Sequence, residues 1–334
     1  MGETIVQTPV DAGTGRRRRA PEIWQPRHPA FWVVAALVLV FGASTAVELA
    51  AAVSAPSALL AAVLLCGVQA VLLWLIVRAM PRFRRQPRSL MIAAVAWGAT
   101  VVPGVAIIAN TAYSDPLWSF GLETLSASLT APVNEDALRL LGVFAVLTLA
   151  AGRRLTVMDG AVYGFLVGAG FEVVENLLYA LRGEDLGSTL STGVVRLLVG
   201  FGLHALWTTA AGAGLAYCLS RRQQGLPGRW WVLIPTTLAP MVLHAGWDAP
   251  SLSVFPFLRL LLLVVLYLLA LALFFASVAW GRRSEYAWFV ETTGSTLSLA
   301  DFRRLPRAER RRLAGGAVAG ADADADADAE RGEA

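Results

Sequence analysis

The chain contains no lysine: all 28 of its basic residues are arginine. It has only two cysteines, Cys66 and Cys218, and both lie within apolar runs, so a disulfide framework is not expected. Two thiols also cannot form a thiolate cage for a metal ion. Charged residues make up 16% of the chain, against about 25% in soluble domains. This shortage of charge argues against an ordinary soluble protein.

Apolar residues make up 56% of the chain, and several uninterrupted runs reach the roughly 20 residues that cross a bilayer core. The sequence therefore predicts an all-α, polytopic helical bundle in the cell membrane, since a transmembrane β-barrel would show short alternating segments. Eight spans are expected, at 31–53, 57–79, 90–112, 134–151, 157–181, 193–219, 230–249 and 254–280. The segment 120–131 could lie at the interface, re-enter the membrane or begin the helix that contains Glu135.

The arginines follow a regular alternation along the chain. They precede the first span, follow the eighth and recur in every second connection, at 16–19, 82–88, 153–154, 221–229 and 282–283. By the positive-inside rule, both termini are expected in the cytoplasm, and the net charge of +4 does not indicate nucleic-acid binding. We expect a disordered basic arm at 1–29, a transmembrane domain at 30–283 and a cytoplasmic tail at 284–334 with a low-complexity acidic end.

Residues 132–139 place two carboxylates and a guanidinium, Glu135, Asp136 and Arg139, in an apolar region. Ionisable groups at membrane depth are costly, so such a cluster is a functional-site hypothesis. On a helix, Glu135 and Arg139 lie one turn apart and can pair, while Asp136 points about 100° away towards another neighbour. A structural ion pair between Glu135 and Arg139 near the membrane surface is the alternative.

Three more polar sites lie at a similar depth in later spans. A rise of roughly 1.5 Å per helical residue, counted from the side at which each span enters, estimates the depth. By this measure the polar groups lie between the middle and the outer surface of the membrane: Glu135, Glu172, Glu175, His204, His244 and Asp248. Scattered structural residues would not coincide in this way, so we expect these side chains to share one pocket.

The helix faces agree with these depths. Gly160, Gly164 and Gly168 recur every four residues ahead of Glu172, and small residues at this spacing let helices approach closely. The face that carries the carboxylates is therefore expected to pack most tightly. The sixth span has a similar stripe, made of Arg196, Gly200, His204 and Thr208.

Each of these sites also has a structural interpretation. Glu172 could form a bridge with Arg196, and Glu175 with Asn176 could join neighbouring helices. His244 and Asp248 lie one turn apart, so that the carboxylate can orient the imidazole or share a ligand with it. An apolar helix does not need a histidine–aspartate pair for its stability. This pair therefore favours a catalytic role over a structural one.

Imidazoles and carboxylates without thiols suit Zn²⁺ with one position open for water. The metal activates the water, and a neighbouring carboxylate takes its proton, an arrangement that fits peptide hydrolysis. In a metal-free alternative, a glutamate activates water directly, and imidazole or asparagine donors stabilise the oxyanion. The sequence contains no HExxH motif and no convincing serine nucleophile.

Four short motifs occur in order between about residues 120 and 250. They are Ala131-Pro132 ahead of Glu135, Asp136 and Arg139; Phe171 ahead of Glu175, Asn176 and Tyr179; His204 with Gly212; and His244 with Trp247 and Asp248. Together they resemble the PrsW family of intramembrane metalloproteases, relatives of the CAAX-processing and bacteriocin-immunity proteases. Asp136 stands where this family usually has a second glutamate, and Arg139 stands where it usually has lysine.

The resemblance implies a membrane-embedded, zinc-dependent peptidase. Its expected substrate is a membrane-anchored protein, such as an anti-sigma factor, cut on the extracytoplasmic side of the bilayer. We expect Glu135 to act as the general base, supported by Asp136, with Arg139 and Asn176 in supporting positions. The residues expected to hold the metal or the reacting water are Glu175, His204, His244 and Asp248.

Two other functions fit the same residues. Buried carboxylates and histidines could form a relay in a proton- or cation-coupled transporter, although the sequence shows no convincing internal repeat. The chain could also be an inactive, immunity-type scaffold.

Overall fold

The computed structural model describes residues 24–53, 55–183, 185–250 and 255–306, together with residues 309, 312 and 313. These residues form helices and contain no strand, which confirms the all-α prediction. The arginines at 16–19 and the acidic repeat at 321–328 lie outside the described residues.

The helices follow one another with short connections. In chain order they are α1 (Pro29–Ala52), α2 (Pro56–Ala79), α3 (Arg88–Ala96), α4 (Val102–Ser119), α5 (Ser126–Leu149), α6 (Val157–Leu181), α7 (Leu186–Val199), α8 (Leu203–Gln223), α9 (Leu233–Asp248), α10 (Pro256–Thr293) and α11 (Leu299–Arg304). A π-helical segment, Trp97–Val101, joins α3 to α4, and 3-10 turns at Glu123–Leu125 and Trp230–Val232 precede α5 and α9.

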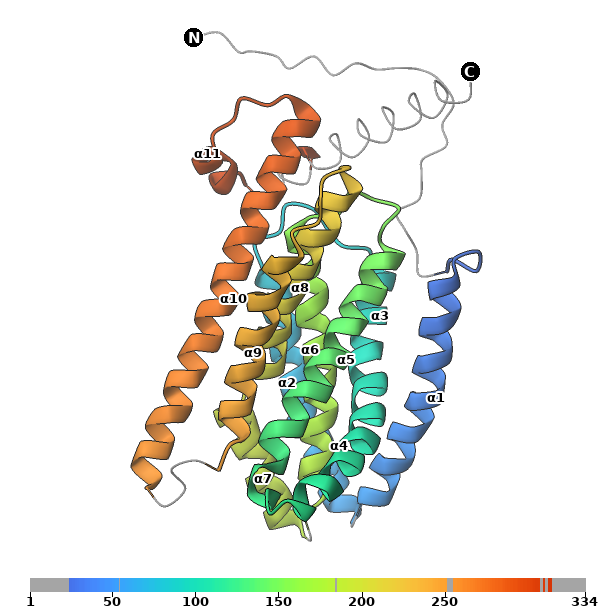
Figure 1. The fold of residues 1–334 in the computed structure, drawn as a ribbon, viewed down its shortest axis with the longest axis vertical. Helices are drawn as coiled ribbons and strands as arrows, with labels where there is room; N and C mark the ends of the chain where they lie inside the picture. The colour runs from blue at the N-terminus through green and yellow to red at the C-terminus, as the bar shows by residue number, and fades with distance from the viewer. Residues whose placement is uncertain are drawn as a thin grey trace.

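Helix α6 lies at the centre of the bundle, with α2, α3, α5, α8 and α10 packed around it (Figure 1). Nearly all of its side chains are buried, whereas α1, α2 and α10 expose many large apolar side chains on the outside. A helix that is apolar on all sides is stable only inside a protein or a membrane. The position of α6 places its polar residues in the interior of the molecule.

The glycines of α6 allow close contact with α8. A Cβ atom at Gly164 would overlap the carbonyl oxygen of Thr208, and one at Gly168 would overlap that of His204. Gly160 meets α8 in the same way. The predicted small-residue face is thus the face that packs most tightly, and it holds α6 against the part of α8 that carries His204.

The first turn of α6 contains a buried charge cluster. Asp159 has no exposed surface and forms a capping box with Thr156. It also forms ion pairs with Arg84, at 3.0 Å, and with Arg153. Because a buried charge is tolerated only with partners, these contacts tie the connections at 80–87 and 150–156 to the same end of the bundle.

Most predicted spans coincide with helices to within a few residues, and 157–181 coincides with α6 at both ends. The undecided segment 120–131 belongs in part to α5, which begins at Ser126 and contains Pro132. The last helix, α10, continues past the expected end at residue 280 to Thr293. The predicted span at 193–219 is wrong as a single helix, because α7 and α8 are bent by 40° at a break between them.

Among the described residues, five helices are long and apolar enough to cross a membrane, or six if the bent pair α7 and α8 counts as one span. Two of the helices outside this set, α5 and α9, carry part of the polar site. Helix α5 contains Glu135, Asp136 and Arg139, and α9 has 16 residues with His244 near its end. The polar side chains that make these two helices less apolar are the same side chains that contribute to the site.

Candidate active site

Helix α5 brings Glu135 and Asp136 to the wall of a cavity. Arg139, which has no exposed surface, forms an ion pair with Asp136, and its Nη2 lies 3.3 Å from His244 Nδ1. The possible pair between Glu135 and Arg139 does not form, because the guanidinium turns towards Asp136 and His244. Glu135 instead accepts a hydrogen bond through Oε1 from Asn110 Nδ2 of α4 at 3.4 Å. Asp136 thus neutralises the buried arginine, and Glu135 faces the cavity.

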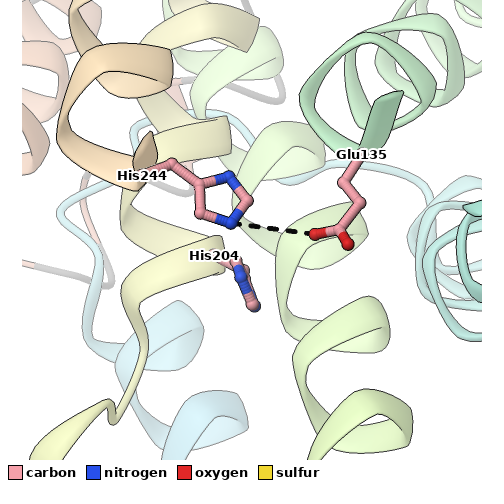
Figure 2. Close-up of side chains that lie close together, drawn as sticks. All are labelled: Glu135, His204 and His244. Atoms are coloured by element: carbon pink, nitrogen blue, oxygen red, sulfur yellow. Dashed lines mark ion pairs between the residues drawn. The ribbon is translucent and has the colours of Figure 1, made fainter. Parts of the chain in front are cut away.

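His244 of α9 lies between carboxylates and is 2% exposed. Its Nδ1 is 3.3 Å from Asp136 Oδ2, and its Nε2 is 3.3 Å from Asp248 Oδ2. Figure 2 shows Nε2 directed towards Glu135, whose Oε2 lies 3.8 Å away. Trp207 stacks on the imidazole, with ring centroids 4.7 Å apart. Asp136 and Arg139 hold Nδ1 away from the cavity, whereas Nε2 faces Glu135 and Asp248, which line it. Nε2 is therefore the nitrogen available for chemistry.

His204 is the second residue of α8, and the break before this helix sets its position. Gly202 has a φ of 79°, a conformation that favours glycine. Glu172 of α6 accepts hydrogen bonds from the backbone N–H groups of Gly202, at 2.6 Å, and His204, at 3.2 Å. A carboxylate at a helix N-terminus satisfies free N–H groups and complements the helix dipole. Glu172 therefore caps α8 and holds the ring of His204 5.2 Å from that of His244 (Figure 2).

Arg196 of α7 contacts the second acidic residue of α6. Its Nη2 lies 2.5 Å from Glu175 Oε2, and its Nε donates to Asn176 Oδ1. The alternative bridge from Arg196 to Glu172 does not form, because Glu172 is engaged at the start of α8. Glu175 Oε2 also lies 3.5 Å from His204 Nδ1. Glu175 and Asn176 thus join α6 to α7, and Glu175 at the same time approaches the site.

Gln69 and Arg259 belong to the site although the sequence analysis did not single them out. Gln69 Nε2 of α2 donates to Glu172 Oε1 at 2.7 Å, and Gln69 Oε1 accepts from Asn176 Nδ2 at 2.9 Å. Arg259 of α10 lines the cavity and donates to the carbonyl oxygen of Trp247 at 2.6 Å. A polar amide within an apolar span was a signal that could have identified Gln69. Arg259 stands at the edge of its span, where arginine is common, and gave no such signal.

The cavity between these helices has a volume of about 550 Å³. Polar side chains that line it include Glu135, Glu172, Glu175, Arg196, His204 and Asp248. Four of the six predicted catalytic residues therefore reach one space, and His244 and Asp136 stand directly behind it. The common depth estimated from the sequence corresponds to a common cavity in the structure.

Glu135, His204 and His244 form a compact donor set. Among the described residues, their ligand atoms all lie within 4.8 Å of one another, and all three side chains are buried. Glu135 Oε2 and His204 Nδ1 are buried without a hydrogen-bond partner in the described part of the chain. Buried polar atoms normally have partners, so unsatisfied ones at this point suit a metal site. Two imidazoles and carboxylates are donors that Zn²⁺ takes in catalytic sites, and the residues present fit this metal.

The segment that contains this site matches a family of known proteases. The sequence model of the PrsW family intramembrane metalloproteases matches residues 86–277, which is more than half of the chain. The chain belongs to the PrsW family. No significant match is found among curated proteins or solved structures. The resemblance found in the motifs is confirmed.

Membership of the PrsW family, together with the apolar helices, makes the chain a multi-pass membrane protease. This favours proteolysis over the alternatives of a transporter and an inactive scaffold. The matched segment includes the cavity residues from Asn110 to Arg259. Helices α1 and α2 precede it, so Gln69 contributes to the PrsW site from outside the matched segment.

Proposed function

We propose that this PrsW protein hydrolyses peptide bonds of membrane-anchored protein substrates, with Zn²⁺ as its metal. One observation carries the proposal: Glu135, His204 and His244 approach one another from α5, α8 and α9 (Figure 2). Ionisable groups from three separate helices have no structural reason to gather beside a cavity in an apolar bundle.

In this proposal His204 and His244 bind the zinc ion, and Glu175 and Asp248 hold the ion or the reacting water, so that one coordination position stays open for water. His204 Nδ1 lies 3.5 Å from Glu175 Oε2, and His244 Nε2 lies 3.3 Å from Asp248 Oδ2. Two ligands of a tetrahedral zinc are about 3.3 Å apart when each bond is about 2.0–2.1 Å. Each spacing is compatible with that carboxylate as a third protein ligand beside the two histidines, which leaves the fourth position for water.

Zinc in this site would polarise the peptide carbonyl group and make water a better nucleophile. Glu135 is supported as the general base because its Oε2 is buried, accepts no hydrogen bond from the described residues and lies 3.8 Å from His244 Nε2. In this role Oε2 takes a proton from the attacking water and gives it to the leaving amine nitrogen, which restores the carboxylate. Asp136 holds Nδ1 of His244 and is itself neutralised by Arg139.

We further propose eight membrane crossings, with both termini in the cytoplasm and the cavity in the outer half of the bilayer. This count treats α3 with α4, and α7 with α8, as single spans, and includes α5 and α9. Contacts between the arginine-rich connections support one basic end: Arg84 pairs with Asp159, Arg154 pairs with Glu291, and Leu155 N–H donates to Gln223. Helix α7, which lines the cavity, lies towards the opposite end (Figure 1).

The proposed substrate is a membrane-anchored regulator, such as an anti-sigma factor, cut on the extracytoplasmic side. A polar cavity enclosed by apolar helices supports a substrate that enters from the membrane and exposes its backbone to the site. The family resemblance is what suggests this class of regulator.

Cleavage of a membrane-anchored model substrate by Glu135→Gln in liposomes tests the proposal. The amide is of similar size but cannot take a proton from water, so the cleavage rate should fall by about 100- to 10,000-fold while zinc content stays unchanged. Glu291→Gln is the matched control, because Glu291 lies outside the cavity and pairs with Arg154 at the surface. Full activity of Glu135→Gln would refute the proposed base, and loss of zinc would show that Glu135 is a ligand.

A further inference from the structure

A second cavity lies far from the active site. Its volume is about 400 Å³, and it is lined by residues 154–157, the last two turns of α8 and the part of α10 from Trp280 to Glu291. Tyr217, on its α8 wall, stands 13 residues after His204, which corresponds to a rise of roughly 20 Å along the helix. The cavity is therefore at the arginine-rich end of the bundle, around the upper parts of α8 and α10 in Figure 1.

The lining of this cavity carries an excess of positive charge. Arg154, Arg221 and Arg283 line it, together with one carboxylate, Glu291. Glu291 is engaged by Arg154. Arg221 donates through Nε to the carbonyl oxygen of Pro227 at 3.0 Å but has no acidic partner in the described part of the chain. Arg283 is exposed and makes neither an ion pair nor a hydrogen bond with the described residues.

Other arginines at this end already have an acidic partner. Arg84 and Arg153 both pair with the buried Asp159, and Arg84 also stacks over the ring of Trp288 at 4.4 Å. They stabilise the junction between connections. The contrast indicates that Arg221 and Arg283 are available to an external anion, whereas Arg84 and Arg153 are not.

Aromatic side chains complete the walls. Tyr217 and Trp280 pack together with ring centroids 5.0 Å apart, and Arg221 lies 5.9 Å from the centroid of the Tyr217 ring. Tyrosine and tryptophan concentrate where a membrane meets water, so these residues mark the level of lipid headgroups. Beyond Trp280, towards the middle of the bundle, α10 exposes large apolar side chains such as Leu268 and Phe275.

We propose that this cavity binds the phosphate group of an anionic phospholipid on the arginine-rich side of the membrane. Guanidinium groups match phosphate oxygens with pairs of charge-assisted hydrogen bonds. Basic pockets between membrane helices are suited to anionic headgroups. A free phosphate ion shares this chemistry, but the aromatic belt and the apolar surface of α10 next to the cavity favour a ligand with acyl chains.

Lipid binding to the purified, delipidated full-length chain tests the proposal, with native mass spectrometry as the readout. Phosphatidylglycerol should bind at least about tenfold more tightly than zwitterionic phosphatidylcholine, and Arg221→Gln/Arg283→Gln should lose this preference. The matched control is Arg222→Gln/Arg282→Gln, which removes the same charge from the neighbouring positions that do not line the cavity. This control should keep the preference.

Two further arms separate a specific site from general attraction. Arg221→Lys/Arg283→Lys retains the charge and should keep most of the preference, and circular dichroism should show unchanged helix content in every variant. Equal weakening in both glutamine double variants would overturn the proposal, because ordinary surface charge would then explain binding. Displacement of the lipid by an equal concentration of inorganic phosphate would also overturn it, because the ligand would then be a soluble anion.

Discussion

At the scale of single residues, Gln69 connects two parts of the active site through one buried amide group. Its nitrogen donates to Glu172, which caps α8, and its oxygen accepts from Asn176, which in turn contacts Arg196. Gln69 is 2% exposed, so both hydrogen bonds are made away from water. Removal of the amide would leave buried polar groups without partners, which costs about 1–3 kcal/mol for each group.

Gln69→Leu is expected to weaken zinc binding by about tenfold or more, because partners behind the ligands fix ligand geometry. Competition with a chelator on the purified protein measures this directly. Val77→Ala is the control, since it removes buried volume from the same helix without touching the polar chain. The control should lower the unfolding temperature and leave zinc affinity unchanged. If Gln69→Leu bound zinc as tightly as the wild type, Gln69 would have no positioning role.

Sequence reasoning located the polar residues and paired His244 with Asp248, which the structure confirms, but it missed most of the other partners. Glu135, His204 and His244 could be grouped because depth follows from the span and the direction of each helix. The pairing of Arg139 with Asp136, and the capping of α8 by Glu172, could not be predicted in the same way. Both depend on which neighbouring helix each side chain contacts, and this is determined by the tertiary structure.

At the scale of helices, the contact between α6 and α8 controls where His204 lies. Gly168 packs directly on the backbone of His204 and Ala205. The first turn of α8 has little freedom to move, because Glu172 holds its N-terminus and α6 covers its side. A substitution on the α6 surface at Gly168 should therefore shift the position of the His204 imidazole.

Gly168→Ala is expected to destabilise the protein by about 1–3 kcal/mol, because the added methyl group overlaps the backbone of α8. It should also reduce zinc affinity, because the first turn of α8 must shift. Gly67→Ala in α2 is the matched control, as its new methyl group would meet nothing within 4 Å. Thermal unfolding and chelator competition measure the two effects. A Gly168→Ala protein with wild-type values would show that α8 can move without consequence.

The glycine face of α6 was predictable because residues spaced four apart lie on the same face of a helix. The break between α7 and α8 was not predicted, because the apolar run continues through it. Gly200 and Gly202 permit the bend, but the carboxylate that stabilises it comes from Glu172, 30 residues earlier in the chain. The prediction that Arg196, Gly200, His204 and Thr208 share one helix face was wrong for the same reason, because the break separates Arg196 from His204.

At the scale of the whole molecule, the fold class was predictable from long apolar runs and few charges. The number of crossings was less predictable, because α5 and α9 contain the polar residues of the site and are therefore less apolar than the other spans. The alternation of arginine-rich connections supports eight crossings even though composition alone identifies five or six among the described residues.

The proposed topology predicts opposite accessibility at two exposed positions, Arg182 after α6 and Thr296 after α10. A membrane-impermeant maleimide should label Arg182→Cys in intact cells and Thr296→Cys only after permeabilisation. The native Cys66 and Cys218 are buried, so background labelling should be low. The reverse pattern would invert the topology and place the cavity in the inner half of the bilayer.

The central claim is that side chains from separate membrane helices form one zinc site. Elemental analysis of the purified protein, beside His244→Ala and His28→Ala, tests it most directly. His28 caps the start of α1 through its contact with Ala30 and is a histidine outside the cavity. Wild type and His28→Ala should each hold about one zinc ion per chain, and His244→Ala should hold far less. Equal zinc in His244→Ala and wild type, or no zinc in wild type after incubation with a stoichiometric amount, would contradict the claim.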